Sequence, residues 1–165
     1  MTRVYNILIF LVTLFFLSRC AGGGYSFTQG APDPNINTVS IQYFTNQAPL
    51  AKPTLSNSFT ESLKDLLQTQ TKLALVSKYG DIQFEGYISG YRNAPVAITG
   101  NETAAKNRLT ISVKVKYINT QDPEKNFEQS FSRYSEYNSN LDLTAVEDEL
   151  ILEINDQLVQ DIFNK

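Results

Sequence analysis

The residues of this chain best suited to chemistry are basic side chains that alternate with apolar ones. Arg108, Lys114 and Lys116 fall at even spacing, and no acidic residue interrupts them. Because alternate residues of a strand point to the same face, the three cations are predicted to share one face of a sheet. Such a row can hold anionic groups such as phosphates, with Thr110 and Ser112 as further donors. The alternative is a solvated polar face that binds nothing.

The composition excludes most catalytic chemistry. With no His and one Cys among 165 residues, the chain cannot build a Ser-His-Asp triad, a Cys-His dyad, a histidine metal site or an internal disulfide. Acidic pairs such as Asp81 with Glu85 or Glu147 with Asp148 lack a nucleophile or a metal, and we interpret them as surface charges. The net charge of −3 gives no reason to expect nucleic acid. We therefore predict a protein without enzymatic activity, metal or cofactor.

The start of the chain is predicted to direct export. Arg3 precedes an apolar run over residues 4–17, which matches the hydrophobic region of a signal peptide. This run is shorter than the roughly 20 residues of a transmembrane helix. Cys20 follows at a position that resembles a bacterial lipobox, although Arg19 replaces the usual small residue. We predict a signal peptide over residues 1–19 and lipidation of Cys20; an ordinary signal peptide or an uncleaved anchor is the alternative.

The hydrophobic pattern predicts one α+β domain over residues 38–165, after a Gly/Pro-rich tether over residues 20–37. Strands are predicted at 38–45, 81–91, 108–117 and 127–137, and helices at about 58–68 and 143–163, with a further short strand at 73–77 as an option. The order β-α-β-β-β-α predicts a two-layer sandwich. In it, a mostly antiparallel four-stranded sheet carries two helices on one face.

The aromatic and glycine residues of the strands raise two further expectations. Gly86 and Gly90 interrupt the second predicted strand and indicate a bulge or a close approach of another element. Four tyrosines are expected either to form an aromatic surface for a large partner or to pack in the core or at a sheet edge. They are Tyr87, Tyr91, Tyr134 and Tyr137.

The two predicted helices have recognisable N-terminal signals. Ser58 and Thr144 each precede a Glu by three positions, which is the spacing of a capping box, and Ser56 is an alternative start of the first helix. Residues 142–165 contain seven acidic residues and one Lys. We interpret these acidic side chains as solvent-facing charge.

Six stretches of the chain, taken in their order and spacing, carry a resemblance that no single motif would carry. They are Cys20 followed by GYSF at 24–27; VSIQYFTN at 39–46; PTLS at 53–56 leading into FTE at 59–61 with Leu63; GDI at 80–82 with EG at 85–86, Ile88 and Tyr91; NRLTI at 107–111 with VKV at 113–115; and DIFN at 161–164. Together they resemble the LptE family of lipopolysaccharide-assembly lipoproteins, also called rare lipoprotein B.

The resemblance implies a sheet with two helices and a definite cellular role. It implies a lipoprotein anchored on the periplasmic side of the outer membrane, which inserts into the lumen of the LptD β-barrel, helps to assemble it and plugs it. The pair would deliver lipopolysaccharide to the cell surface. Since lipid A is phosphorylated, the resemblance makes Arg108, Lys114 and Lys116 candidate ligand contacts, with Lys106 and Arg92 as further members. The alternative is a periplasm-facing lipoprotein that binds another anionic lipid or a polysaccharide without a barrel partner.

Overall fold

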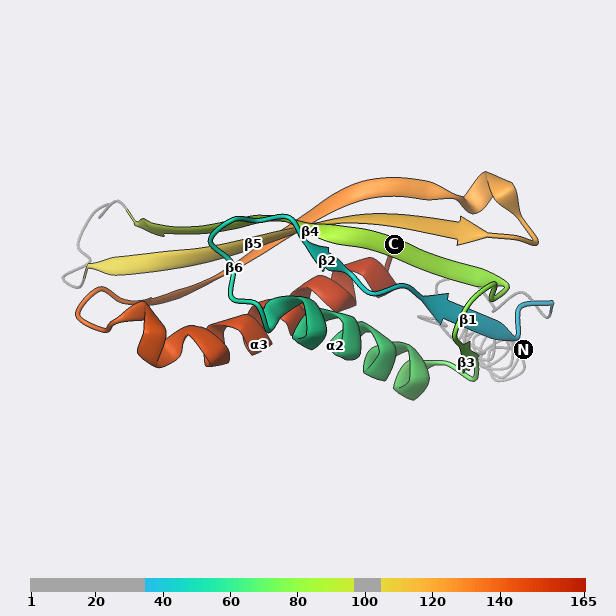
Figure 1. Cartoon of the computed structure of the whole chain (residues 1–165), viewed down its shortest axis with the longest axis horizontal. Helices are drawn as coiled ribbons and strands as arrows, with labels where there is room; N and C mark the ends of the chain where they lie inside the picture. The colour runs from blue at the N-terminus through green and yellow to red at the C-terminus, as the bar shows by residue number, and fades with distance from the viewer. Residues whose placement is uncertain (1–34, 97–104) are drawn as a thin grey trace, which may run out of the picture. The chain divides into compact units, whose positions relative to one another are not determined.

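Two helices pack on one face of a six-stranded mixed sheet in the computed structural model, which describes residues 35–96 and 105–165 (Figure 1). The predicted signal peptide, Cys20 and most of the tether lie outside these residues. The elements in chain order are β1 (Thr38–Ile41), β2 (Thr45–Asn46), α2 (Leu55–Gln70), β3 (Ala74–Val76), β4 (Ile82–Pro95), β5 (Lys106–Asn119), the 3-10 helix η1 (Pro123–Lys125), β6 (Phe127–Asn138) and α3 (Leu143–Phe163). The predicted α+β class is confirmed.

The sheet is larger than the four strands predicted. Its order is β3-β1-β4-β5-β6, and β2 pairs with β4 off this path. The long strands β4, β5 and β6 are antiparallel, whereas the short strands β1, β2 and β3 add parallel pairings. The optional strand at 73–77 is present as β3. None of the helices in the described residues has the length and hydrophobicity needed to span a membrane.

The core lies between the sheet and the helices. Alternate residues of β5 point into it, and Leu109, Ile111, Val113 and Val115 are fully buried there. The helices contribute apolar residues that recur every three or four positions, as expected for one buried stripe. Those fully buried are Leu55, Phe59 and Leu63 of α2 and Ile154 and Leu158 of α3. Burial of this apolar surface, worth about 25 cal/mol per Å², holds the two layers together.

The first predicted strand is broken after Ile41. Unbroken alternation would bury Tyr43, but Tyr43 is 55% exposed and Phe44 is fully buried instead. The backbone amide of Phe44 donates to Thr60 Oγ1 of α2 at 3.1 Å, and the Phe44 ring meets Phe59 edge-on with centroids 5.0 Å apart. The chain therefore bends between β1 and β2 so that a large ring fills the space between sheet and helix.

Neither predicted capping box forms. Ser56 and Ser58 both lie inside α2, and Ser58 Oγ accepts a hydrogen bond from the buried Asn155 of α3 at 3.1 Å. The N-cap of α3 is Asp142, whose Oδ1 accepts from the Thr144 amide at 3.0 Å. The hydrogen bonds that the carboxylate accepts from the Thr144 amide and hydroxyl lower the pKa of Asp142. A carboxylate is a stronger acceptor than a hydroxyl, which explains why Asp142 caps the helix in place of Thr144.

The connection from β3 to β4 crosses β1, because β1 lies between those two strands. Gly80 allows the crossing, since a Cβ there would lie 2.6 Å from the backbone nitrogen of Ser40. Asp81 then accepts hydrogen bonds through Oδ2 from the Asn37 and Thr38 amides, both at 2.9 Å, and from Thr38 Oγ1 at 2.8 Å. These bonds lower the pKa of Asp81 and fasten the first strand to the start of β4.

The pairing of β4 with β5 contains both features that the two glycines indicated. At Gly86 the strands approach so closely that a Cβ would lie 2.1 Å from the carbonyl oxygen of Lys114. The register then shifts between Ile88 and Gly90, so Ser89 is the extra residue of a β-bulge. Because successive residues alternate between faces, the bulge reverses the face to which every later residue of β4 points.

We predict that Gly86→Ala lowers the free energy of unfolding by about 2–3 kcal/mol, because the added methyl group must push β5 or the Phe44 ring away. Gly90→Ala in the same strand is the matched control. A Cβ at Gly90 would meet only the Ser112 side chain, at 3.3 Å, and we expect a loss below about 1 kcal/mol. Urea denaturation measures both, and equal stability of the two variants would contradict this reading of the β4–β5 contact.

Candidate functional site

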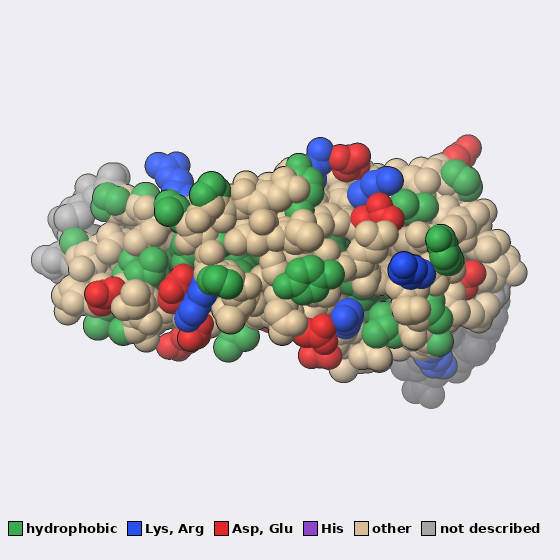
Figure 2. Space-filling view, viewed as in Figure 1, with side chains coloured by type: hydrophobic (Ala, Val, Ile, Leu, Met, Phe, Trp, Pro, Cys, Tyr) green, Lys and Arg blue, Asp and Glu red, His purple; other side chains and the backbone are tan. Residues whose placement is uncertain are grey.

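The face of β4, β5 and β6 that points away from the helices is called the open face below. Lys106, Arg108, Lys114 and Lys116 of β5 lie on it, because they alternate with the buried residues of that strand. The candidate cations of β5 therefore share one face. Figure 2 shows that Lys and Arg side chains are often adjacent to Asp and Glu side chains at the surface, which the sequence pattern of β5 alone does not reveal.

Each of these four cations is paired with a glutamate on a neighbouring strand. The pairs are Lys106 and Arg108 with Glu136 of β6, Lys114 with Glu128 of β6, and Lys116 with Glu85 of β4. Sequence reasoning missed these glutamates, although they also occupy alternate positions of their strands. Half-exposed ion pairs of this kind contribute about 0–1 kcal/mol each, so their cations can exchange partners at little cost.

Arg108 is the most constrained of the four cations. Its Nε and Nη2 donate to Glu136 Oε1 at 3.0 and 2.5 Å, and the guanidinium carbon lies 3.9 Å from the centre of the Tyr134 ring. The hydrogen bond raises the pKa of Arg108 and lowers the pKa of Glu136. The planar guanidinium is thus held between a carboxylate and an aromatic face, as such groups prefer.

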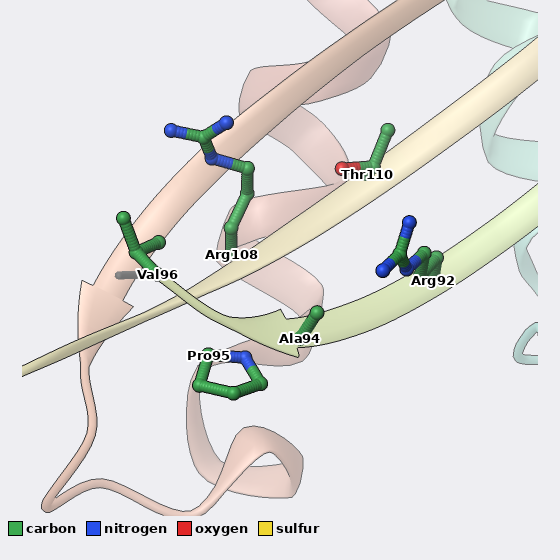
Figure 3. A pocket seen from close by; sticks show the side chains of 6 residues that line it. All are labelled: Arg92, Ala94, Pro95, Val96, Arg108 and Thr110. Atoms are coloured by element: carbon green, nitrogen blue, oxygen red, sulfur yellow. The ribbon is translucent and has the colours of Figure 1, made fainter.

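Arg92 and Arg108 border a shallow depression of about 280 Å³ on the open face (Figure 3). The strand register pairs Arg92 with Thr110 and Ala94 with Arg108, so a short side chain lies across from each arginine. Within residues 35–96 and 105–165, Arg92 has no carboxylate within ion-pairing distance. It differs in this respect from the four candidate cations of β5.

The four tyrosines do not form one surface. Before the bulge Tyr87 points to the open face, and after it Tyr91 points to the helices. The Tyr91 hydroxyl donates to Glu147 of α3 at 2.5 Å, and burial together with this bond raises the pKa of Tyr91. Tyr137 is also on the helix side and is 7% exposed, whereas Tyr134 lies on the open face beneath Arg108. Packing in the core or at a sheet edge therefore holds for Tyr91 and Tyr137, while the aromatic surface for a large partner stays a prediction for Tyr87 and Tyr134.

Of the acidic side chains of α3, Asp148 and Glu153 are exposed as expected, whereas Glu147 and Asp161 are partly buried, and all four have partners outside the helix. These residues connect the helix to the sheet or to the loop before α2. The contacts are Glu147 with Tyr91, Glu153 with Ser135 at 2.7 Å, Asp161 with Arg133 at 2.5 Å, and Asp148 with Lys52 at 2.5 Å. The acidic face of α3 is thus partly a packing surface, which the sequence could not show without the strand that α3 covers.

The arrangement has the chemistry of a binding surface. Among the described residues no three metal-ligating side chains come together. The open face offers cations, hydroxyl groups and the rings of Tyr87 and Tyr134 on one sheet, which suits recognition of an anionic or polar partner. The fold and its open face thus define a binding or assembly domain.

A match to a family model identifies the family within this class of domain. The model for LptE, described as lipopolysaccharide-assembly, matches residues 36–165. The chain therefore belongs to the LptE family of lipopolysaccharide-assembly lipoproteins. This family is non-catalytic, so the prediction that the chain is not an enzyme is confirmed.

Two solved structures, from Acinetobacter baumannii and Chlamydia trachomatis, share the fold at low sequence identity. A minor lipoprotein from Acinetobacter baumannii has a TM-score of 0.52 at 14% identity, covering 77% of this chain and 89% of the other. A hypothetical protein from Chlamydia trachomatis has a TM-score of 0.52 at 10% identity, covering 78% and 94%. The rare lipoprotein B from Shewanella oneidensis has a TM-score of 0.49 at 10% identity, covering 78% and 95%. No curated protein matches the chain in sequence.

We predict that Tyr91→Phe lowers the free energy of unfolding by about 1 kcal/mol, because Glu147 loses a partly buried hydrogen bond. Tyr87→Phe is the control, since the Tyr87 hydroxyl has no hydrogen-bond partner among the described residues. We expect that variant to unfold like the wild type in urea. A destabilised Tyr87→Phe with an unaffected Tyr91→Phe would show that the bulge is wrongly placed.

Proposed function

We propose that this chain assembles with a β-barrel of the LptD type, plugs it, and takes part in the transport of lipopolysaccharide to the cell surface. Membership of the LptE family supports a role in lipopolysaccharide assembly. The observation that carries the proposal further is the open face, which no described helix covers and which presents a row of cations (Figure 1). A face of this kind is suited to a large polar or anionic partner.

The cations of the open face are proposed to contact the phosphates of lipopolysaccharide. The residues are Arg92, Lys106, Arg108, Lys114 and Lys116. Four of them already bind carboxylates that are themselves partly exposed, so a phosphate would replace or join an existing oxyanion. Charge-assisted hydrogen bonds to phosphate are stronger than neutral ones, which favours this exchange.

The proposal places the protein at the outer membrane, anchored by lipid on Cys20 and facing the periplasm. The lipobox-like position of Cys20 supports the anchor. More than one acyl chain would be needed for firm anchoring, because a single chain binds a bilayer only marginally. The proposed tether between Cys20 and β1 would leave the domain free to reach a partner in the same membrane.

A second function keeps the lipid anchor and the open face but needs no barrel. In it the chain binds another anionic lipid or a polysaccharide directly from the periplasmic side. The same row of cations favours this alternative, since these side chains would also bind the phosphates of another lipid or the carboxylates of a polysaccharide. The two functions differ in whether a large membrane protein accompanies the chain.

Extraction of the tagged full chain in a mild detergent distinguishes them. We expect a large β-barrel protein to co-purify in a fixed ratio, and to remain after a high-salt wash, because plugging buries an extensive surface rather than a few exposed charges. If the chain instead elutes without a barrel but with anionic lipid or polysaccharide bound, the second function holds and the first is contradicted.

A further inference from the structure

Arg92 and Arg108 are diagonal neighbours on two paired strands. Diagonal positions of an antiparallel pair have Cβ atoms about 7–8 Å apart, within reach of long side chains. Figure 3 shows both arginine side chains and Thr110 rising from the same side of the sheet. Both side chains line one depression, and a phosphate group placed in it would accept hydrogen bonds from both guanidinium groups.

The depression between the two arginines has room for such a group. Its volume is about 280 Å³, and its floor is formed by the short side chains of Ala94 and Thr110. A water molecule accounts for about 30 Å³ of liquid, so a phosphate group of five heavy atoms fits with its remaining hydration. The Thr110 hydroxyl offers a further donor at the floor.

Glu136 holds Arg108 in the absence of such an anion. It lies directly opposite Arg108 on β6, on the side of β5 away from Arg92. The Glu136 carboxylate accepts hydrogen bonds from Nε and Nη2 of Arg108, and Lys106 Nζ lies 3.7 Å from its other oxygen. The Glu136 side chain is 25% exposed and the Arg108 side chain 38% exposed, so a ligand can reach both.

We propose that Glu136 is an internal competitor, which occupies Arg108 until a phosphate group that bridges Arg92 and Arg108 displaces it. The inference deepens the proposed lipopolysaccharide contact and rests on it. A phosphate monoester carries about −1.5 to −2 charges near neutral pH, whereas the carboxylate and a phosphodiester carry one. The competitor therefore selects phosphate monoesters, which outcompete it, over phosphodiesters, which do not.

The test compares two variants that each remove one negative charge, one from β6 and one from α3. The full chain in detergent micelles is titrated onto immobilised lipopolysaccharide bearing its phosphate monoesters. For Glu136→Gln we expect the dissociation constant to fall about threefold to fivefold, because Arg108 becomes available without displacement. For Asp156→Asn, whose exposed carboxylate on α3 forms no ion pair with any of the proposed phosphate contacts, we expect less than about a twofold change.

Two further measurements test where the phosphate group binds and whether a monoester is preferred. Arg92→Gln is expected to weaken binding, and in its background the gain from Glu136→Gln should fall by at least half, because one phosphate bridges both arginines. Vesicles with phosphatidic acid, a monoester, should bind the wild type better than vesicles with phosphatidylglycerol, a diester. Glu136→Gln should narrow that preference, a change that loss of a merely structural ion pair would not produce.

The outcomes separate this inference from the function on which it rests. If the wild type does not bind lipopolysaccharide, the proposed contact and the competitor both fail. If the wild type binds but Glu136→Gln leaves affinity unchanged, weakens it, or matches Asp156→Asn, only the competitor is overturned. Additive effects of Arg92→Gln and Glu136→Gln would likewise overturn the bridging phosphate.

Discussion

The β-bulge at Ser89 of β4 determines which side chains meet on each face of the sheet. One extra residue places Tyr91 against Glu147 of α3 and Arg92 on the open face near Arg108. Without the bulge Arg92 would point toward the helices, where an unpaired guanidinium is costly to bury. The contact of Tyr91 with α3 and the depression on the open face therefore depend on the same irregularity in one strand.

The charges of the open face are balanced rather than uniformly basic. Glutamates of β4 and β6 neutralise the cations of β5, so the face attracts anions only where a cation lacks a partner or can exchange one. Among the described residues the depression beside Arg92 meets both conditions. Membership of the LptE family gives this chemistry its context in lipopolysaccharide assembly.

The sequence predicts those parts of the fold that depend on local periodicity. The alternation of β5 and the helical spacing of α3 place the core correctly, and the two glycines of β4 indicate both a close approach and a bulge. The short parallel strands and the glutamate partners depend on how distant strands align, which local pattern does not encode. The direction of Tyr91 and Arg92 could not be predicted for the same reason, because it changes with the one residue that is bulged.

Crosslinking in living cells shows whether lipopolysaccharide contacts the open face. A photo-reactive amino acid is placed either at Thr110, which lines the depression, or at Leu152, which is 61% exposed on α3. We expect a lipopolysaccharide adduct from position 110 and little or none from position 152. Equal adducts from both positions, or an adduct from position 152 alone, would contradict it.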